Sequence, residues 1–236
     1  MEKINLFCFP FAGGSKYSYR SYQDFLPANI VLRNVEIPGR GSRANETPLA
    51  SLEQIADDIF TQIKGELHQP YAFYGHSMGG LLTYLLSQRV VANGLPNPLS
   101  LFITGAIGPS AKYRGLIDYR LPRTEFFDQL KKLGGSPEEV LNNELLMEFF
   151  EPVLRADFEA VATYQYQQKT VMNIPISVII GDREKATLEE AKRWSLESTM
   201  PVDVQVYEGD HFFIFHHQES VIKSITEKLN TKVILS

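Results

Sequence analysis

The chain has 236 residues, of which 44% are hydrophobic and 22% charged, the composition of an ordinary globular protein. Its formal net charge of −5 argues against general nucleic-acid binding, which requires a basic face. Cys8 is the one cysteine of the sequence, which excludes an internal disulfide and a cysteine-cluster zinc site. No apolar stretch is long enough to span a bilayer, and no signal peptide is recognisable. We therefore expect a cytoplasmic protein that does not bind membranes.

Short apolar runs alternate with amphipathic helices along the first hundred residues, as in crossover units on a parallel sheet. Buried strands are expected at 4–9, 30–35, 71–74 and 99–104. Ser51 is the expected N-cap of the first helix, with Gln54 completing a capping box, and another helix is predicted at 81–91. The pattern predicts an α/β fold with a mostly parallel central sheet and helices on both faces.

Strand signals stop after Gly105 and return at 176–180. A helix at 188–196, a strand at 202–207 and a closing helix complete the expected pattern. The intervening segment has the character of several helices. We therefore expect residues 1–236 to form a single domain with a helical insertion at about 110–165. An insertion at the carboxyl end of a strand lies above that edge of the sheet, where it can act as a lid.

The sequence GHSMG at 75–79 lies between a predicted strand and a predicted helix. A serine on such a sharp turn holds its hydroxyl clear of the backbone, and flanking glycines avoid collisions with neighbouring strands. Ser77 is therefore predicted to be a nucleophile, with the Met78 N–H directed at an oxyanion. The alternative is that Ser77 merely caps the helix that follows.

A nucleophilic serine needs a general base, and the candidates are His68, His76, His211, His216 and His217. His76 adjoins the serine and cannot fold back onto it, and His68 precedes the strand at 71–74, on the wrong side of the sheet. His216 and His217 are expected in or beside the first turn of the closing helix. His211 follows the last strand, at the carboxyl edge, and is the predicted base; its alternative role is to cap that helix.

The acid that orients the histidine should follow the strand at 176–180, where two carboxylates compete. Asp182 has the commoner side chain for this role, whereas Glu184 lies further along the loop and reaches one methylene further. Either could accept the hydrogen bond of the distal imidazole nitrogen. Spacing leaves the choice open, and the other carboxylate would cap a loop or a helix.

A second oxyanion donor is expected from the loop after an early strand. FPFAGG at 9–14 supplies that loop, and its two glycines let the backbone approach the serine closely. The N–H of Ala12, or failing that of Phe11, is predicted to point inward. A phosphate-binding role for these glycines is disfavoured, because no lysine–serine or lysine–threonine pair follows them.

Six motifs, in order along nearly the whole chain, resemble type II thioesterases, the free-standing α/β-hydrolases that accompany nonribosomal peptide and polyketide synthetases. The motifs are FPFAGG at 9–14, IPGRGSRANETP at 37–48, GHSMGG at 75–80, the LRADF-containing segment at 133–164, GDRE at 181–184 and GDHFF at 209–213. Other serine hydrolases share the serine turn and the histidine. FPFAGG, PGRG and LRADF are the motifs most specific to this family.

The resemblance implies an α/β-hydrolase fold and hydrolysis of acyl thioesters from the phosphopantetheine arm of carrier proteins, which clears stalled or misprimed synthetases. It implies no cofactor and no metal of the enzyme's own, since the substrate brings the phosphopantetheine. The family's GDxD loop has its second carboxylate, the triad acid, at the position of Glu184, so the resemblance favours Glu184 over Asp182.

Rival functions are a medium-chain fatty acyl thioesterase, a lipase or carboxylesterase acting on free esters, and a non-catalytic protein that binds acyl carriers. A lipase would more often carry a signal peptide, and a non-catalytic protein would lack a member of the triad.

The insertion offers features suited to a carrier-bound acyl group. Its residues Phe126, Phe127, Leu130 and Leu133 would give a helix an apolar face that either closes over the acyl group or packs as permanent core. Carrier domains generally present an acidic face. The expected contacts are the basic residues Lys112, Arg114, Arg120 and Arg123, each of which, taken singly, is more typical of a solvated loop.

Overall fold

The computed structural model describes residues 3–111, 115–135, 141 and 143–233, and within these residues six strands form one sheet. The strand order is β2-β1-β3-β4-β5-β6, and every neighbouring pair is parallel. The bounds are β1 Ile4–Phe9, β2 Ile30–Asn34, β3 Tyr71–His76, β4 Leu101–Thr104, β5 Ile176–Gly181 and β6 Val202–Tyr207. Each lies within two residues of its predicted position, and β3 is the strand that extends furthest beyond the prediction.

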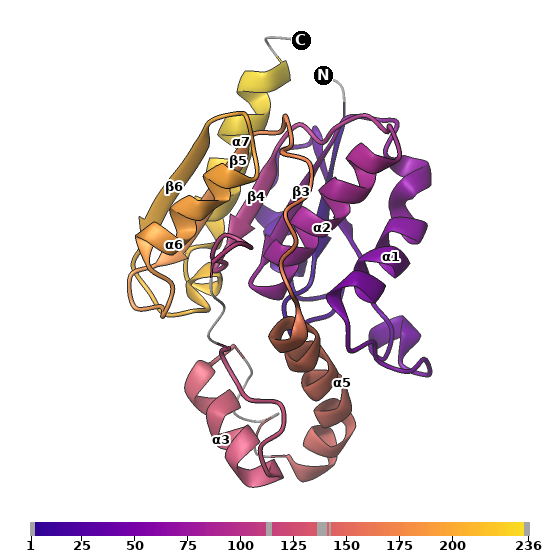
Figure 1. Cartoon of the computed structure of the whole chain (residues 1–236), viewed down its shortest axis with the longest axis vertical. Coiled ribbons are helices and arrows are strands. Elements are labelled where there is room, and N and C mark those ends of the chain that lie inside the picture. Colours follow the sequence, from indigo (N-terminus) through magenta and orange to yellow (C-terminus); the bar gives the residue numbers. More distant parts are fainter. Residues whose placement is uncertain (1–2, 112–114, 136–140, 142, 234–236) are drawn as a thin grey trace.

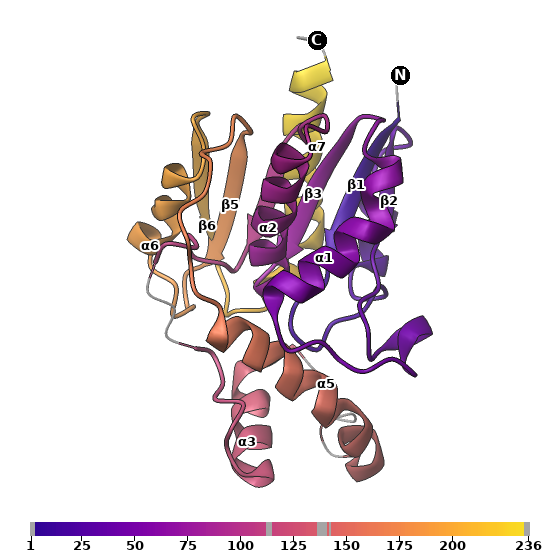
Figure 2. The ribbon, with the colours of Figure 1, turned by 45° about the vertical axis from the view of Figure 1, so that its right-hand side comes forward.

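Helices cover both faces of the sheet (Figure 1). One face carries α1 (Leu52–Ile63), α2 (Met78–Ala92) and α6 (Leu188–Lys192), and the other carries α7 (Gln218–Val233) (Figure 2). Alternate residues of β1 serve the two faces: Phe7 packs toward α1 and α2, and Leu6 packs toward α7. The four central strands β1, β3, β4 and β5 are buried on both faces and form near-continuous apolar runs, which is why they are visible in the sequence.

Short 3₁₀ turns join several of these elements. They are η1 Arg20–Phe25, η2 Gly41–Arg43, η3 Lys64–Glu66, η4 Arg193–Leu196 and η5 Phe213–Phe215. The helix predicted at 188–196 is α6 followed directly by η4. Trp194 of η4 is fully buried and its indole N–H donates to the Ala106 carbonyl at 3.0 Å, which ties this segment to the loop after β4.

The predicted capping box at the start of α1 is wrong. Ser51 precedes the helix as expected, but its side chain makes no cap hydrogen bond. The start of α1 is determined instead by packing, because the helix buries one apolar face against the sheet from Leu52 onward. A capping box does form at α6, where Thr187 and Glu190 exchange hydrogen bonds with each other's backbone N–H.

The inserted segment contains α3 (Arg123–Leu133) and α5 (Glu144–Thr163), which extend beyond the lower edge of the sheet in both views (Figures 1 and 2). These helices share a small apolar cluster in which Phe126 and Leu130 of α3 pack with Leu154 and Phe158 of α5. The insertion therefore has a core of its own, separate from the two that flank the sheet. No helix in the described part of the chain has the length and apolarity needed to cross a membrane.

Candidate active site

Ser77 is the single residue between β3 and α2, at the carboxyl edge of the sheet. Its backbone has φ 55° and ψ −116°, a strained conformation that persists only where the surrounding structure enforces it. The turn depends on glycines, because a Cβ on Gly75 would lie 2.0 Å from the Gly79 oxygen and one on Gly79 would lie 2.2 Å from the Phe9 oxygen. The turn leads directly into α2, which therefore begins at Met78, three residues before the predicted start.

The loop after β6 brings His211 to the same edge of the sheet. His211 Nε2 lies 3.0 Å from Ser77 Oγ, although the two residues are 134 positions apart in the sequence. The imidazole is buried between aromatic rings: its centroid lies 4.7 Å from that of His76 and 5.1 Å from that of Phe212. The serine hydroxyl and an imidazole nitrogen are thus in direct hydrogen-bonding contact.

Of the two competing carboxylates, Glu184 is the one in contact with the histidine. Glu184 Oε2 lies 2.7 Å from His211 Nδ1, and the Gly181 N–H donates to Glu184 Oε1 at 2.8 Å. The Glu184 side chain is 3% exposed. Asp182 is half-exposed and its Oδ1 accepts the Gly209 N–H at 2.8 Å. Asp182 therefore joins the loop after β5 to the loop after β6, while Glu184 faces the imidazole.

The other histidines lie away from the serine hydroxyl. His76 is fully buried, with Nδ1 3.1 Å from the Thr104 hydroxyl, and burial followed by the charge of His211 lowers the pKa of His76 well below its usual value. His68 lies in the exposed turn before β3, at the opposite end of the strand from Ser77. His216 and His217 precede α7, and His217 Nε2 donates to the Glu208 carbonyl.

The turn at 9–14 lies against the first residues of α2. A Cβ on Gly79 would lie 2.2 Å from the Phe9 oxygen and 3.1 Å from the Pro10 oxygen. The Gly14 N–H donates to the Phe11 carbonyl at 2.8 Å and closes the turn. The Phe11 ring is buried in edge contact with His76 and Phe212. Among the described residues, no protein acceptor takes the N–H of Ala12 or that of Met78.

A cavity of about 520 Å³ opens beside Ser77. The insertion contributes Gln129, Lys132 and Leu133 from α3 and Val161 from α5 to its wall. Its apolar lining includes Leu81 of α2, Ile107 of the loop after β4, Ala186 of the loop after β5, and Leu116, Leu133 and Val161 of the insertion. Ile107, Leu116 and Val161 escaped the sequence analysis, because an apolar residue that lines a cavity has the same pattern as one that fills a core.

A parallel sheet with a strained serine turn at its carboxyl edge, in contact with a histidine from the last loop, defines an α/β-hydrolase. Residues 4–229 match the family model of the thioesterase domain. The chain therefore belongs to the thioesterase family, whose members hydrolyse acyl thioesters.

Individual relatives agree with this assignment. Gramicidin S biosynthesis protein GrsT of Aneurinibacillus migulanus is 32% identical over 228 residues, which cover 96% of this chain and 89% of the relative. The crystal structure of ClbQ from the colibactin NRPS/PKS pathway superposes with a TM-score of 0.94 at 29% identity and covers all of both chains. The type II thioesterase BorB from the borrelidin biosynthetic cluster gives a TM-score of 0.89 at 30% identity, over 96% of this chain and 93% of BorB. The resemblance to type II thioesterases is thereby confirmed.

Proposed function

We propose that this thioesterase removes acyl groups from the phosphopantetheine arm of carrier domains and so restores stalled or misprimed nonribosomal peptide and polyketide synthetases. The observation that carries the proposal is the contact between Ser77, His211 and Glu184 at the mouth of a largely apolar cavity. The names of the relatives, which place them in gramicidin, colibactin and borrelidin biosynthesis, support the choice of substrate.

In the acylation half of the reaction, Ser77 Oγ attacks the thioester carbonyl while His211 Nε2 takes the hydroxyl proton. Glu184 accepts the Nδ1–H of His211, which holds the imidazole in the correct tautomer and stabilises the imidazolium. The N–H groups of Met78 and Ala12 donate to the oxyanion of the tetrahedral intermediate. Collapse breaks the carbon–sulfur bond, and the thiol leaves with the proton that His211 holds.

Deacylation repeats the sequence with water as the nucleophile. His211 takes a proton from water, the hydroxide attacks the acyl-serine ester, and the ester oxygen of Ser77 leaves with that proton. The products are the free acid and the regenerated serine. Throughout, the acyl chain lies in the apolar cavity, and residues 110–165 act as the lid that covers it.

Replacement of the proposed nucleophile tests this function. Ser77→Ala should abolish turnover of an acyl-carrier protein and leave the thermal unfolding midpoint nearly unchanged, because the hydroxyl contributes little packing. Ser51→Ala is the matched control, since the Ser51 hydroxyl makes no cap hydrogen bond. A fluorophosphonate probe followed by peptide mass mapping should label Ser77.

Substrate comparison completes the test. The proposed function expects a higher kcat/KM on acyl-carrier protein than on the same acyl group as a coenzyme A thioester or a simple ester. Labelling at another serine, or full activity of Ser77→Ala, would show that the mechanism is wrong. Equal kcat/KM on the free and the carrier-bound thioesters would instead identify an ordinary fatty acyl thioesterase.

A further inference from the structure

A buried ion pair lies next to the turn at 9–14 and takes no part in the chemistry described above. Arg40 Nη1 lies 2.6 Å from Asp157 Oδ2, and Arg40 Nη2 lies 2.8 Å from Asp157 Oδ1, so the guanidinium holds the carboxylate in two parallel hydrogen bonds. The side chains are 4% and 0% exposed. Among the arginine–carboxylate and lysine–carboxylate pairs of the described residues, this is the one with both side chains removed from solvent.

Both members of the pair also bind the backbone of the turn. The Gly13 N–H donates to Asp157 Oδ2 at 2.7 Å, and Arg40 Nη1 donates to the Gly14 carbonyl at 3.0 Å. Gly13 has φ +78°, and a Cβ there would lie 2.5 Å from Leu154 Cδ2, so the turn fits closely against α5. The carboxylate therefore holds the peptide group between Ala12 and Gly13, and the guanidinium holds the one between Gly14 and Ser15.

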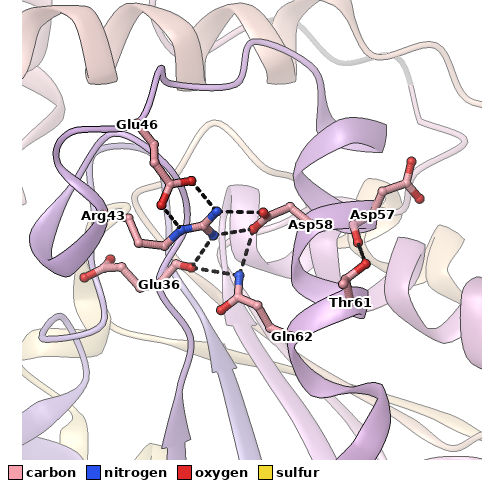
Figure 3. A network of polar contacts seen from close by, with 7 residues as sticks. All are labelled: Glu36, Arg43, Glu46, Asp57, Asp58, Thr61 and Gln62. Atoms are coloured by element: carbon pink, nitrogen blue, oxygen red, sulfur yellow. Dashed lines mark hydrogen bonds and ion pairs between the residues drawn. The ribbon is translucent and has the colours of Figure 1, made fainter.

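The pair unites the three motifs most specific to the family, FPFAGG, PGRG and LRADF, none of which supplies a member of the serine–histidine–glutamate contact. The segment that carries Arg40 is itself anchored to α1 (Figure 3). Arg43 pairs with Asp58 of α1 at 2.6 Å, and the Glu36 carbonyl accepts from Arg43 and from Gln62. Arg40 thus lies on a loop that is anchored to α1, and Asp157 lies on α5.

We propose that Arg40 and Asp157 are positioning residues that hold the Ala12 N–H at the site of the oxyanion. This inference rests on the proposed function. Stability alone gives little reason for the pair, since apolar residues of similar volume often replace a buried ion pair at no cost to stability. The placement of the oxyanion donor gives a functional reason for the pair, because a donor displaced by about 1 Å loses most of its effect on the rate.

Two double variants distinguish an effect on the position of the Ala12 N–H from an effect on the stability of the fold. Arg40→Met with Asp157→Leu removes both charges and leaves the Gly13 N–H without an acceptor. Arg40→Met with Asp157→Asn also removes both charges, but the amide oxygen still accepts from Gly13. Both should unfold within about 5 °C of the wild type, whereas each single variant should unfold at a lower temperature because it leaves a buried charge unpaired.

Kinetics on an acyl-pantetheine thioester give the decisive measurement. The Met/Leu double variant should lose about 100-fold in kcat with KM changed less than about threefold, and the Met/Asn double variant should regain at least about tenfold of that loss. The Ki of a trifluoromethyl ketone analogue, whose adduct carries the oxyanion, should rise by the same factor as kcat falls. Arg89→Met, which breaks contacts between α2 and α1, controls for lost stability and should retain kcat.

Wild-type kcat and Ki in the Met/Leu double variant would overturn the proposal, as would equal losses in the two double variants. If the Met/Leu variant does not fold, Arg40→Lys serves instead: it keeps the charge but loses the paired geometry, and it should lose about tenfold in kcat at constant KM. Full kcat in Arg40→Lys would equally overturn the proposal. Ser77→Ala assayed in parallel keeps the outcomes distinct, because activity in that variant would refute the mechanism whatever the pair does.

Discussion

Glu184 and Asp182 lie two residues apart on one loop, yet each accepts a hydrogen bond from a different part of the site. Residues 181–184 form a turn in which the Gly181 N–H donates to Glu184 Oε1 and leaves Oε2 facing His211. Asp182 lies within that turn, and its carboxylate accepts the Gly209 N–H of the loop after β6. The longer side chain of Glu184 thus reaches back to His211 from a position further along the loop.

This difference predicts opposite results for two isosteric substitutions. Glu184→Gln should lower kcat by roughly 10⁴-fold, because an amide cannot hold the imidazole in the required tautomer. Asp182→Asn keeps an oxygen that accepts the Gly209 N–H and should lower kcat by less than about tenfold. Steady-state kinetics on one acyl thioester suffice for the comparison. A greater loss in Asp182→Asn than in Glu184→Gln would contradict the geometry.

His76 predicts a pH dependence of stability. Its pKa in the folded protein lies well below the unfolded value of about 6.5, chiefly because of burial, so below pH 6.5 the unfolded chain binds a proton that the folded protein does not. The free energy of unfolding should therefore fall as the pH falls below about 6.5, with this residue contributing up to about 1.4 kcal/mol per pH unit.

Urea denaturation at pH 7.5, 6.5 and 5.5 measures this contribution. His76→Asn retains a polar group toward the Thr104 hydroxyl but cannot titrate, so its stability should depend less steeply on pH over that range. The effect is read as the difference between the slopes of the variant and the wild type. Parallel slopes would show that His76 is not the source.

At the scale of elements, the apolar stripe of α3 divides between two surroundings. Phe126 and Leu130 are buried against α5 in the core of the insertion, as in the permanent-core alternative. Leu133, at the end of the same stripe, lines the cavity beside Ser77. One helix therefore both stabilises the insertion and shapes the space for the acyl group.

Leu133 should accordingly affect chain-length selectivity. Leu133→Trp fills part of the cavity and should lower kcat/KM for a decanoyl-pantetheine thioester by about 10- to 100-fold, while the acetyl thioester changes less than about threefold. Leu145→Trp, on an exposed position of α5, is the control and should alter neither value. Equal losses on both substrates would place the acyl chain elsewhere.

At the scale of the whole molecule, charge bears on recognition of a carrier domain. The protein has a net charge of −5, so an acidic partner requires a local basic region. Arg120 pairs with Asp118 at 2.9 Å and Arg123 pairs with Glu151 at 3.2 Å, so carboxylates already offset both predicted contacts. Lys112 and Arg114 lie outside the described residues. Lys132 and Lys185, in contrast, line the cavity that holds Ser77.

Charge reversal distinguishes the two groups of cations. Lys132→Glu with Lys185→Glu should lower kcat/KM on an acyl-carrier protein by about tenfold at low ionic strength, less at high salt, and spare a small pantetheine thioester. Arg120→Glu with Arg123→Glu is the matched pair. A loss of kcat/KM confined to the arginine variant would show that the carrier domain docks at the near edge of the insertion instead. Equal losses of the lysine variant on both substrates would make its effect structural.

The sequence by itself determined the layers of the fold and the place of the serine turn. Central strands buried on both faces are near-continuous apolar runs, and the edge strand β6 alternates apolar and polar residues. Both patterns are local, which is why all six strands were located to within two residues. Chain order also indicated where the site lies, because residues that follow the strands of a parallel sheet gather at one edge. Ser77, Glu184 and His211 each follow a strand.

The tertiary structure decided what depends on the path of a loop or on contacts between distant segments. Asp182 and Glu184 are equivalent in sequence pattern, and the backbone turn over 181–184 directs their carboxylates to different partners. Arg40 and Asp157 are 117 positions apart, so no local period could join them. The cap of α1 failed as a prediction for the same reason: burial of a helix face against the sheet outweighs a side-chain hydrogen bond at its end, and burial is a property of the assembled chain.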